Sequence, residues 1–353
     1  MNAPQAHPAP APDTLFDVVV VGGGPAGATA ADDLARAGHR VLLLDRAGRT
    51  KPCGGAVPPR LIRDFEIPDH LLVARAQAAR MVAPSGAQVD IPIEGGFVGM
   101  VDREVFDEWL RERAALHGAV RCTGRFLQLQ TTDDGWTVVH WCAPGEEASP
   151  RQVRTRLVIG ADGARSAVAQ QAVAGWDKGR WVFAYHEIVQ TPAEPPAGFK
   201  GSRCEVHYDG RLSPDFYGWV FPHGGTVSIG TGSADKGFSL RGATAALRRS
   251  VQLEGATTLR REGAPIPMKP LPRWDNGRNV VLAGDAAGVV APASGEGIYY
   301  AMLGGRLAAE AVARCLATGD ARALAGARRS FMREHGRVFW VLGIMQGFWY
   351  VSD

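Results

Sequence analysis

Three glycines near the N-terminus have the spacing of a loop that receives a phosphate group. Gly22, Gly24 and Gly27 form the pattern Gly-x-Gly-x-x-Gly. In such a loop the first glycine permits a tight turn, the second lets a pyrophosphate approach the backbone, and the third lets a helix pack closely on a strand. The pattern alone is a weak signal, because ordinary turns are also rich in glycine.

The elements expected around this loop strengthen the prediction. Residues 16–21 are rich in valine, which is typical of a buried parallel strand, and residues 26–37 are rich in alanine and predict a helix. Residues 39–45 predict a second buried strand, which ends at Asp45. An acid at this place can accept hydrogen bonds from ribose hydroxyls, so the segment predicts a βαβ unit that binds a dinucleotide.

A second acidic motif, near the other end of the chain, favours FAD over NAD. Residues 279–283 predict a buried strand, and Gly284 and Asp285 follow it. Asp285 can then reach the ribityl hydroxyls of a flavin, and residues 295–298 open a long helix whose N–H groups can contact the flavin ring. The alternative is a coincidental Gly-Asp turn.

The middle of the chain has a different pattern, which suits a largely antiparallel sheet. The predicted strands are residues 181–189, 204–208, 217–221 and 227–231, a helix is expected over 240–253, and the Pro-rich residues 265–272 predict a linker. Tyr217, Trp219 and Phe221 alternate, so they share one face of their strand. They form either an aromatic wall of a binding site or a stripe in the core.

These elements predict an α/β protein with a discontinuous, Rossmann-like FAD-binding domain. That domain has three layers around a parallel sheet, and an inserted substrate domain has an antiparallel sheet. The FAD-binding domain comprises residues 15–66, 100–166 and 275–322, with a helix over 102–116, paired strands over 124–131 and 136–142, and a strand over 156–160. The substrate domain comprises 67–99 and 167–274, with a disordered tail at 1–14 and a helical segment at 323–353.

Four further motifs give the chain a resemblance to the geranylgeranyl reductases, within the flavoproteins that include the aromatic hydroxylases. They are Pro52-Cys53-Gly54-Gly55, the Arg-x-x-Phe-Asp-x-Trp pattern of residues 103–109, and the segments 214–222 and 291–298. The resemblance is strongest to the bacterial branch that acts on the geranylgeranyl chain of bacteriochlorophyll. Members of that branch usually continue past a segment like residues 349–353, so a truncated C-terminus is expected.

The resemblance implies a role for each matching residue. Asp45 would bind the adenosine ribose, Cys53 and Gly54 would lie near the flavin, and Arg103 near its phosphates. Asp285, Gly297 and Ile298 would lie along the ribityl chain and ring. Cys53 would assist proton delivery or, alternatively, pack as a small apolar residue. Tyr217 and Trp219 would line a channel for a prenyl chain.

The activity implied by the resemblance is an FAD-dependent reduction of isoprenoid C=C bonds. NADPH, or alternatively a ferredoxin, would reduce FAD, and the flavin would pass a hydride to the alkene. The proton would come from Tyr217, Cys53 or bound water. The substrate would be a geranylgeranylated pigment or geranylgeranyl diphosphate, and the product a phytyl chain.

Three alternatives stay open at this point. The same fold could serve a flavin monooxygenase or halogenase. The substrate could instead be a prenyl lipid or a quinone tail. A flavin-bound protein without turnover, acting in pigment assembly, is the third alternative.

Composition limits the classes of partner and the cellular location that we expect. The net charge of +3 gives no argument for nucleic acid, and the scattered histidines and five cysteines lack the spacing of metal ligands. No apolar run reaches the roughly 18 residues that a spanning helix requires. We expect a cytoplasmic protein, with peripheral contact at the photosynthetic inner membrane as an option. The aromatic residues 339, 340 and 348–350 would pack on the body or rest at a membrane interface.

Overall fold

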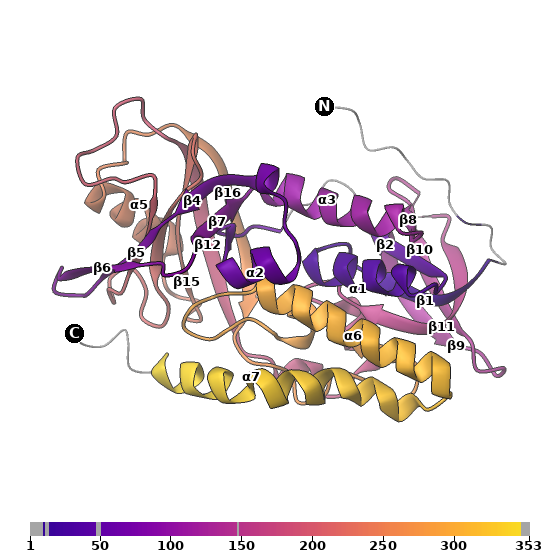
Figure 1. Cartoon of the computed structure of the whole chain (residues 1–353). Coiled ribbons are helices and arrows are strands. Elements are labelled where there is room, and N and C mark those ends of the chain that lie inside the picture. The colour runs from indigo at the N-terminus through magenta and orange to yellow at the C-terminus, as the bar shows by residue number, and fades with distance from the viewer. Residues whose placement is uncertain (1–9, 11–13, 47–50, 147, 347–353) are drawn as a thin grey trace.

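The structure, a computed structural model, describes residues 10, 14–46, 51–146 and 148–346. It contains two large sheets and a small one, with helices beside them (Figure 1). The expected tail over 1–14 and the aromatic residues 348–350 lie almost wholly outside the described residues. The predicted domain boundaries remain a prediction, although the strands fall into sheets that can be compared with them.

The first large sheet carries the glycine loop. Its strands run in the order β8-β2-β1-β11-β10-β9, and β17 also pairs with β11. The parallel strands are β1 (Leu15–Val21), β2 (Val41–Asp45), β8 (Val120–Thr123), β11 (Arg151–Gly160) and β17 (Val280–Leu282). The antiparallel strands are β9 (Arg125–Thr131) and β10 (Thr137–Cys142). The predicted strands are all present in this sheet.

Strand β11 begins five residues before its predicted start at residue 156, at Arg151. Its first half pairs with β10, and buried and exposed residues alternate there instead of forming a continuous apolar run. The sequence therefore signalled only the second half, where β11 lies between the buried strands β1 and β17.

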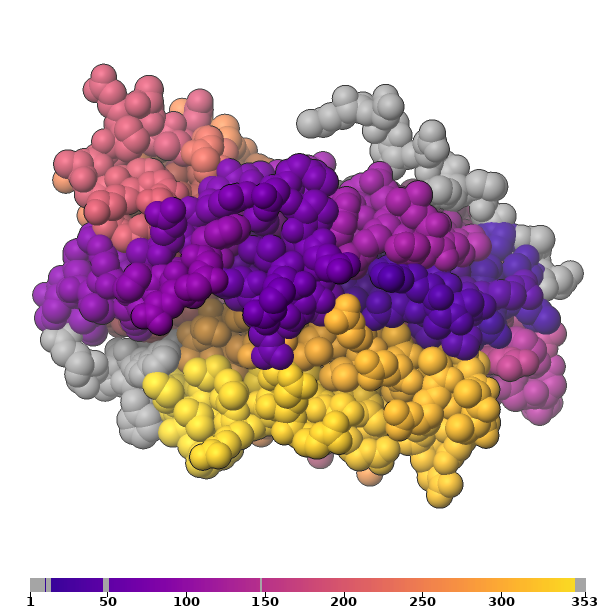
Figure 2. All heavy atoms as spheres, in the orientation of Figure 1, coloured from indigo at the N-terminus to yellow at the C-terminus, as the bar shows by residue number. Residues whose placement is uncertain are grey.

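Helices from both ends of the chain pack on one another beside this sheet. Helix α1 (Pro25–Arg36) contacts α3 (Arg103–Leu116) and α6 (Ile298–Thr318), and α7 (Gly326–Met345) packs along α6. Figure 2 shows the two ends of the chain, indigo and orange, in contact on one face. A Cβ at Gly305 of α6 would lie 2.1 Å from the Ala26 carbonyl oxygen, so a glycine is required at this close approach. Asp102 caps α3, accepting from the Glu104 N–H at 2.9 Å.

The second large sheet has the order β16-β12-β15-β14-β13-β5-β6. Its strands are β5 (Ala78–Val82), β6 (Gln88–Pro92), β12 (Trp181–Gln190), β13 (Arg203–His207), β14 (Gly218–Pro222), β15 (Thr226–Ser233) and β16 (Thr258–Pro267). All neighbours are antiparallel except β13 and β5, which are parallel. Helix α5 (Leu240–Ser250) packs on β15 and β12.

The predicted linker over 265–272 was partly wrong, because residues 265–267 belong to β16. Pro265 and Pro267 cannot donate ladder hydrogen bonds, and their presence suggested a break in the strand. Strand β16 lies at the edge of its sheet, where a proline is tolerated because one side of the strand has no partner.

The remaining elements are short and connect these units. A small sheet contains β3 (Ala56–Val57), β4 (Leu72–Ala76) and β7 (Val98–Val101). The short helices are α2 (Pro59–Asp64) and α4 (Ala167–Ala172), and the 3-10 turns are η1 (Asp69–Leu71), η2 (Trp176–Lys178), η3 (Gly284–Ala287) and η4 (Ala321–Ala325). Across the described part of the chain, the helices are too short or too polar to cross a bilayer.

Candidate active site

The three glycines of the glycine loop have two different structural roles. Gly22 has φ +105°, and a Cβ there would lie 2.3 Å from the Ala161 carbonyl oxygen. A Cβ at Gly27 would lie 1.8 Å from the Gly22 oxygen. A Cβ at Gly24 would meet nothing within 4 Å, although Gly24 directly precedes α1. Gly22 and Gly27 therefore allow close packing, whereas Gly24 leaves open space at the helix start.

This open space fits a pyrophosphate. Helix α1 has no side-chain cap and no acidic residue in its first turn. The N–H groups of that turn thus lack a side-chain acceptor, and the helix dipole favours an anion there. The residues present therefore fit the phosphate part of FAD.

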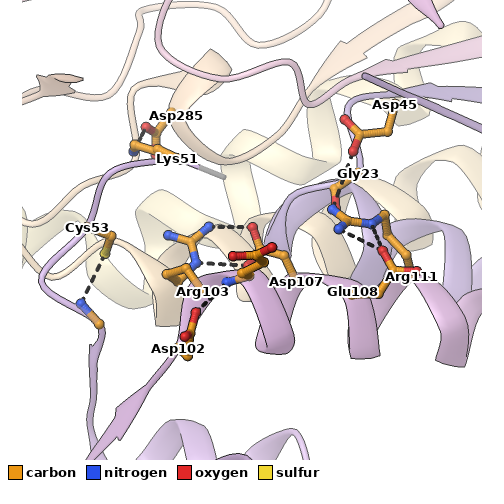
Figure 3. Close-up of polar contacts among 12 residues, drawn as sticks. Gly23, Asp45, Lys51, Cys53, Asp102, Arg103, Asp107, Glu108, Arg111 and Asp285 are labelled. Carbon is orange, nitrogen blue, oxygen red and sulfur yellow. Dashed lines mark hydrogen bonds and ion pairs between the residues drawn. The ribbon is translucent and has the colours of Figure 1, made fainter. Parts of the chain in front are cut away.

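Asp45 lies beside the loop at the end of β2, as predicted. Its carboxylate is 3.3 Å from Nη1 of Arg111, which also donates to the Gly23 carbonyl oxygen at 3.1 Å (Figure 3). Burial raises the pKa of Asp45 above its usual range. Arg111 was not predicted to be a site residue. It lies eight residues after Arg103 on the same helix, and this spacing was the available signal.

Arg103 is held by a bidentate ion pair within α3. Its Nε and Nη2 each donate to an Asp107 carboxylate oxygen at 2.8 Å, and both residues are buried. Burial opposes the charge on Arg103, but Asp107 and Cys53 together outweigh it and raise the pKa of the guanidinium. A guanidinium has five N–H donors, so Asp107 leaves donors for a further anion. The predicted contact of Arg103 with flavin phosphates stays a prediction.

A cavity of about 180 Å³ brings together segments that are distant in the sequence. Predicted site residues from four parts of the chain line it, namely Cys53, Gly54, Arg103, Tyr217, Trp219, Asp285, Gly297 and Ile298. Gly22, Gly24, Gly27 and Asp45 do not line it. Pro25, the first residue of α1, does, so the cavity begins where the glycine loop ends.

Asp285 forms an ion pair with Lys51 at the wall of this cavity (Figure 3). The Asp285 side chain is almost buried, and Lys51 is about one-third exposed. Lys51 was not predicted to be a site residue. Its position directly before the Pro-Cys-Gly-Gly motif was the available signal.

The aromatic row of Tyr217, Trp219 and Phe221 forms one wall of the cavity, and its predicted common face is confirmed. The Tyr217 hydroxyl donates to the Ser294 carbonyl oxygen at 2.6 Å. On the facing side, a Cβ at Gly54 would lie 3.0 Å from the Phe221 ring. The Cys53–Gly54 loop thus packs directly against the row.

A polar network behind the row fixes the indole of Trp219. Trp219 Nε1 donates to Ser228 Oγ at 3.1 Å, and Ser228 Oγ lies 3.0 Å from His186 Nδ1. His186 Nε2 lies 3.2 Å from Glu262. Glu262, His186, Gly230 and Trp219 are direct cross-strand neighbours, and a Cβ at Gly230 would lie 2.5 Å from both His186 and Trp219.

Cys53 differs from the other cysteines in exposure. It is half-buried and its sulfur accepts from the Gly55 N–H at 3.4 Å, whereas the other four cysteines are buried. Burial raises the pKa of Cys122 to about 11 and that of Cys204 to about 12. No grouping of metal-ligating side chains occurs among the described residues. Cys53 alone of these thiols lines the cavity.

Two acids near the site have different surroundings. Asp162, in the segment Ala161-Asp162-Gly163, accepts from the Ala167 and Val168 N–H groups at 2.7 and 3.2 Å, at the start of α4, whose N-cap residue is Ser166. Glu296 lines the cavity and accepts from the Tyr299 N–H at 2.9 Å. Sequence reasoning missed Glu296, although it lies within the 291–298 motif.

A second, larger cavity of about 530 Å³ contains none of the predicted site residues. It is lined mainly by α4, the first residues of β12 and the segment before α5, with Ala286 at its border. The smaller cavity is therefore the candidate active site, because the flavin motifs and the aromatic row meet only there.

Comparison with known proteins agrees with this geometry. The family model described as "FAD binding domain" matches residues 15–329. Geranylgeranyl diphosphate reductase of Rhodobacter capsulatus is 59% identical, covering 96% of this chain and 85% of that protein. Digeranylgeranylglycerophospholipid reductase of Methanoculleus marisnigri is 31% identical, covering 86% of this chain and 78% of that protein.

Solved structures share the fold at low identity. A geranylgeranyl bacteriochlorophyll reductase-like protein from Thermoplasma acidophilum has a TM-score of 0.86 at 20% identity, covering 96% of this chain and 88% of that chain. The flavin-dependent brominase Bmp2 has a TM-score of 0.76 at 18% identity, covering 96% and 88%. These two likenesses show the fold alone, and together with the FAD-binding family model they confirm the predicted fold class. From the extent and identity of the sequence matches, the chain belongs to the geranylgeranyl reductase family of FAD-binding proteins.

Proposed function

We propose that this chain is an enzyme that uses FAD to reduce the C=C bonds of a geranylgeranyl chain to a phytyl chain. One observation carries the proposal: a single cavity joins the flavin motifs of both chain ends to an apolar, aromatic wall. A binding site for an isoprenoid needs such a wall, because the chain offers no polar groups to recognise. The family membership supports the same reaction.

The chain's own residues would hold FAD at defined points. The open space at Gly24 and the start of α1 would receive the pyrophosphate, and Asp45 the adenosine ribose. Asp285 would accept from the ribityl hydroxyls, and the N–H groups at the start of α6, by Gly297 and Ile298, would contact the ring. When bound, FAD supplies hydride transfer, which no protein side chain supplies.

The aromatic row would orient the alkene and exclude water. Tyr217 and Trp219 are anchored by hydrogen bonds, so their rings have fixed positions at the wall. A fixed apolar wall favours one placement of a flexible chain, which lowers the entropic part of the barrier. Cys53, on the facing loop, would contact the reacting region.

The head group that carries the geranylgeranyl chain would be bacteriochlorophyll or a diphosphate. The name of the Rhodobacter relative supports the diphosphate, and the resemblance in the sequence motifs supports the pigment. The lipid reductase of Methanoculleus keeps a prenyl lipid as a further candidate. NADPH is the proposed donor, with a ferredoxin as the alternative.

We also propose that the chain works in the cytoplasm, at the surface of the photosynthetic membrane. An exposed apolar patch on α7, formed by Val338, Trp340, Val341 and Ile344, supports this contact. Trp340 is 67% exposed, which is unusual for a large apolar side chain. Trp340→Ser should reduce sedimentation with vesicles of anionic lipid, and unchanged sedimentation would argue against the patch.

The test is an anaerobic incubation of the FAD-loaded protein with each substrate in parallel, with NADPH or reduced ferredoxin. Mass analysis should show the gain of hydrogen pairs on the isoprenoid chain, and the preferred head group and donor follow from the rates. Under air, a product that gained oxygen or halogen would support the monooxygenase or halogenase alternative. Retention of FAD without turnover under every condition would support a non-catalytic role.

A further inference from the structure

Reduction of an isolated alkene requires an acid as well as a hydride. Phenols and thiols are weak acids as classes, with ordinary pKa values of about 10 and about 8.5. The Tyr217 hydroxyl, moreover, already donates to the Ser294 carbonyl oxygen at 2.6 Å. A carboxylic acid is a stronger proton donor than either class of group.

Glu296 is a carboxyl group at the wall of the same cavity. It lies between Gly295, where a Cβ would be 2.7 Å from the Tyr217 hydroxyl oxygen, and Gly297, which directly precedes α6. The Tyr299 N–H donates to Glu296 Oε1 at 2.9 Å and so fixes the carboxyl group. A carboxyl group has about four acceptor sites, which leaves room for a proton beside this hydrogen bond.

The surroundings of Glu296 allow it to carry a proton at neutral pH. Burial raises the pKa of Glu296 to about 7, against the opposing effect of the Tyr299 and Ile298 N–H groups. Its charge in turn contributes to the raised pKa of Tyr300, after burial. The other titratable side chains that line the cavity, within the described part of the chain, are Lys51, Cys53, Arg103, His186, Tyr217 and Asp285.

We propose that Glu296 is the catalytic acid that donates the proton to the alkene. This inference rests on the proposed function. One alkene carbon receives a hydride, with its two electrons, from the reduced flavin, and a new C–H bond forms. The π electrons form the second C–H bond with the Glu296 proton, whose O–H electron pair stays on the carboxylate. Solvent then returns a proton to Glu296, and the two-electron donor reduces the flavin again.

The test compares Glu296→Gln with wild type in single-turnover reduction of the geranylgeranyl chain. Glutamine keeps the acceptor for the Tyr299 N–H but has no acidic proton, so the helix start is preserved. We expect a rate loss of about 100-fold or more, the usual contribution of a general acid. FAD affinity and flavin reduction by dithionite should stay within about twofold, a change equivalent to less than half a kcal/mol.

Two further variants test whether the acidic proton of Glu296 itself is required. Glu296→Asp restores a carboxylic acid and should recover part of the rate. Glu310→Gln makes the same chemical change at an exposed position of α6 and should have no effect. The wild-type rate should fall as the pH rises through about 7, where Glu296 loses its proton. A Glu296→Gln variant that keeps more than a third of the wild-type rate would overturn the proposal.

A readout without FAD tests the state of the carboxyl group directly. A carboxyl whose pKa is raised on folding binds its proton more tightly in the folded state, so stability falls as the pH rises from about 4.3 to the folded value. The Tm of the wild-type apoprotein should therefore fall, relative to that of Glu296→Gln, between about pH 4.5 and 7. Parallel Tm curves would overturn the proposal. Failure of wild type to reduce any chain would instead refute the proposed function.

Discussion

Two substitutions in the glycine loop should affect protein stability and cofactor binding differently. We compare Gly24→Ala with Gly27→Ala, two identical chemical changes three residues apart. At Gly24 the new methyl group meets nothing within 4 Å, and the backbone has φ −73° and ψ −176°, which any residue can adopt. At Gly27 the methyl group would lie 1.8 Å from the Gly22 carbonyl oxygen.

The expected changes in stability and in FAD affinity follow from the structure. Gly24→Ala should change the stability of the apoprotein by less than about 1 kcal/mol, because the entropy that alanine removes from the unfolded chain is offset by its poorer capping at the N-cap position of α1. The same methyl group stands where the pyrophosphate would bind, and loss of one charge-assisted hydrogen bond costs about 1.5–3 kcal/mol, or roughly a 10- to 150-fold rise in Kd for FAD. Gly27→Ala should destabilise the apoprotein by about 1–3 kcal/mol or more through overpacking.

The assay is urea unfolding of each apoprotein, followed by titration with FAD monitored by flavin fluorescence. We expect Gly24→Ala to stay within about 1 kcal/mol of wild type in stability yet to bind FAD more weakly. If Gly24→Ala bound FAD with wild-type affinity, the assignment of the open space to the pyrophosphate would be refuted. A loss of stability as large as that of Gly27→Ala would show that Gly24, like Gly27, serves packing.

Three further predictions concern the cavity and its surroundings. Asp285→Asn should purify with less FAD, by about tenfold in affinity, because the amide is a weaker acceptor for ribityl hydroxyls, and equal absorbance of bound flavin would contradict this. Gly230→Ala should retain FAD but lose chain reduction, because its Cβ would lie 2.5 Å from both His186 and Trp219; normal single-turnover rates would contradict it. Burial lowers the pKa of His223, so the unfolded chain takes up the proton first as the pH falls below about 6.5, and stability should decrease there. In His223→Gln this dependence in urea unfolding should be smaller, and an unchanged slope would refute it.

The sequence was sufficient for features that depend on local geometry. The glycine loop requires a strand, a turn and a helix in immediate succession, so its spacing predicted the arrangement around Gly22 and Gly27. The alternation of Tyr217, Trp219 and Phe221 predicted a common face for the same reason. Asp45 and Asp285 were found because each lies at the carboxyl end of a buried strand.

Features that depend on distant segments were missed. Lys51 pairs with Asp285, which lies 234 residues later in the sequence, and no local pattern predicts such a pairing. Glu296 is partly buried and its pKa is raised, and no local pattern predicts burial of a residue type that is usually exposed. The prolines of β16 suggested a linker, since the sequence does not reveal that this strand lies at a sheet edge.

The central claim is that hydride passes from reduced flavin to an isoprenoid alkene. Its most direct test is a single turnover without oxygen: the FAD-loaded protein is reduced, freed of excess reductant and mixed with a geranylgeranylated substrate. The account predicts that the absorbance of oxidised flavin returns in step with formation of a product carrying two more hydrogens. Flavin that stays reduced with either proposed head group, and reoxidises only when oxygen is admitted, would contradict it.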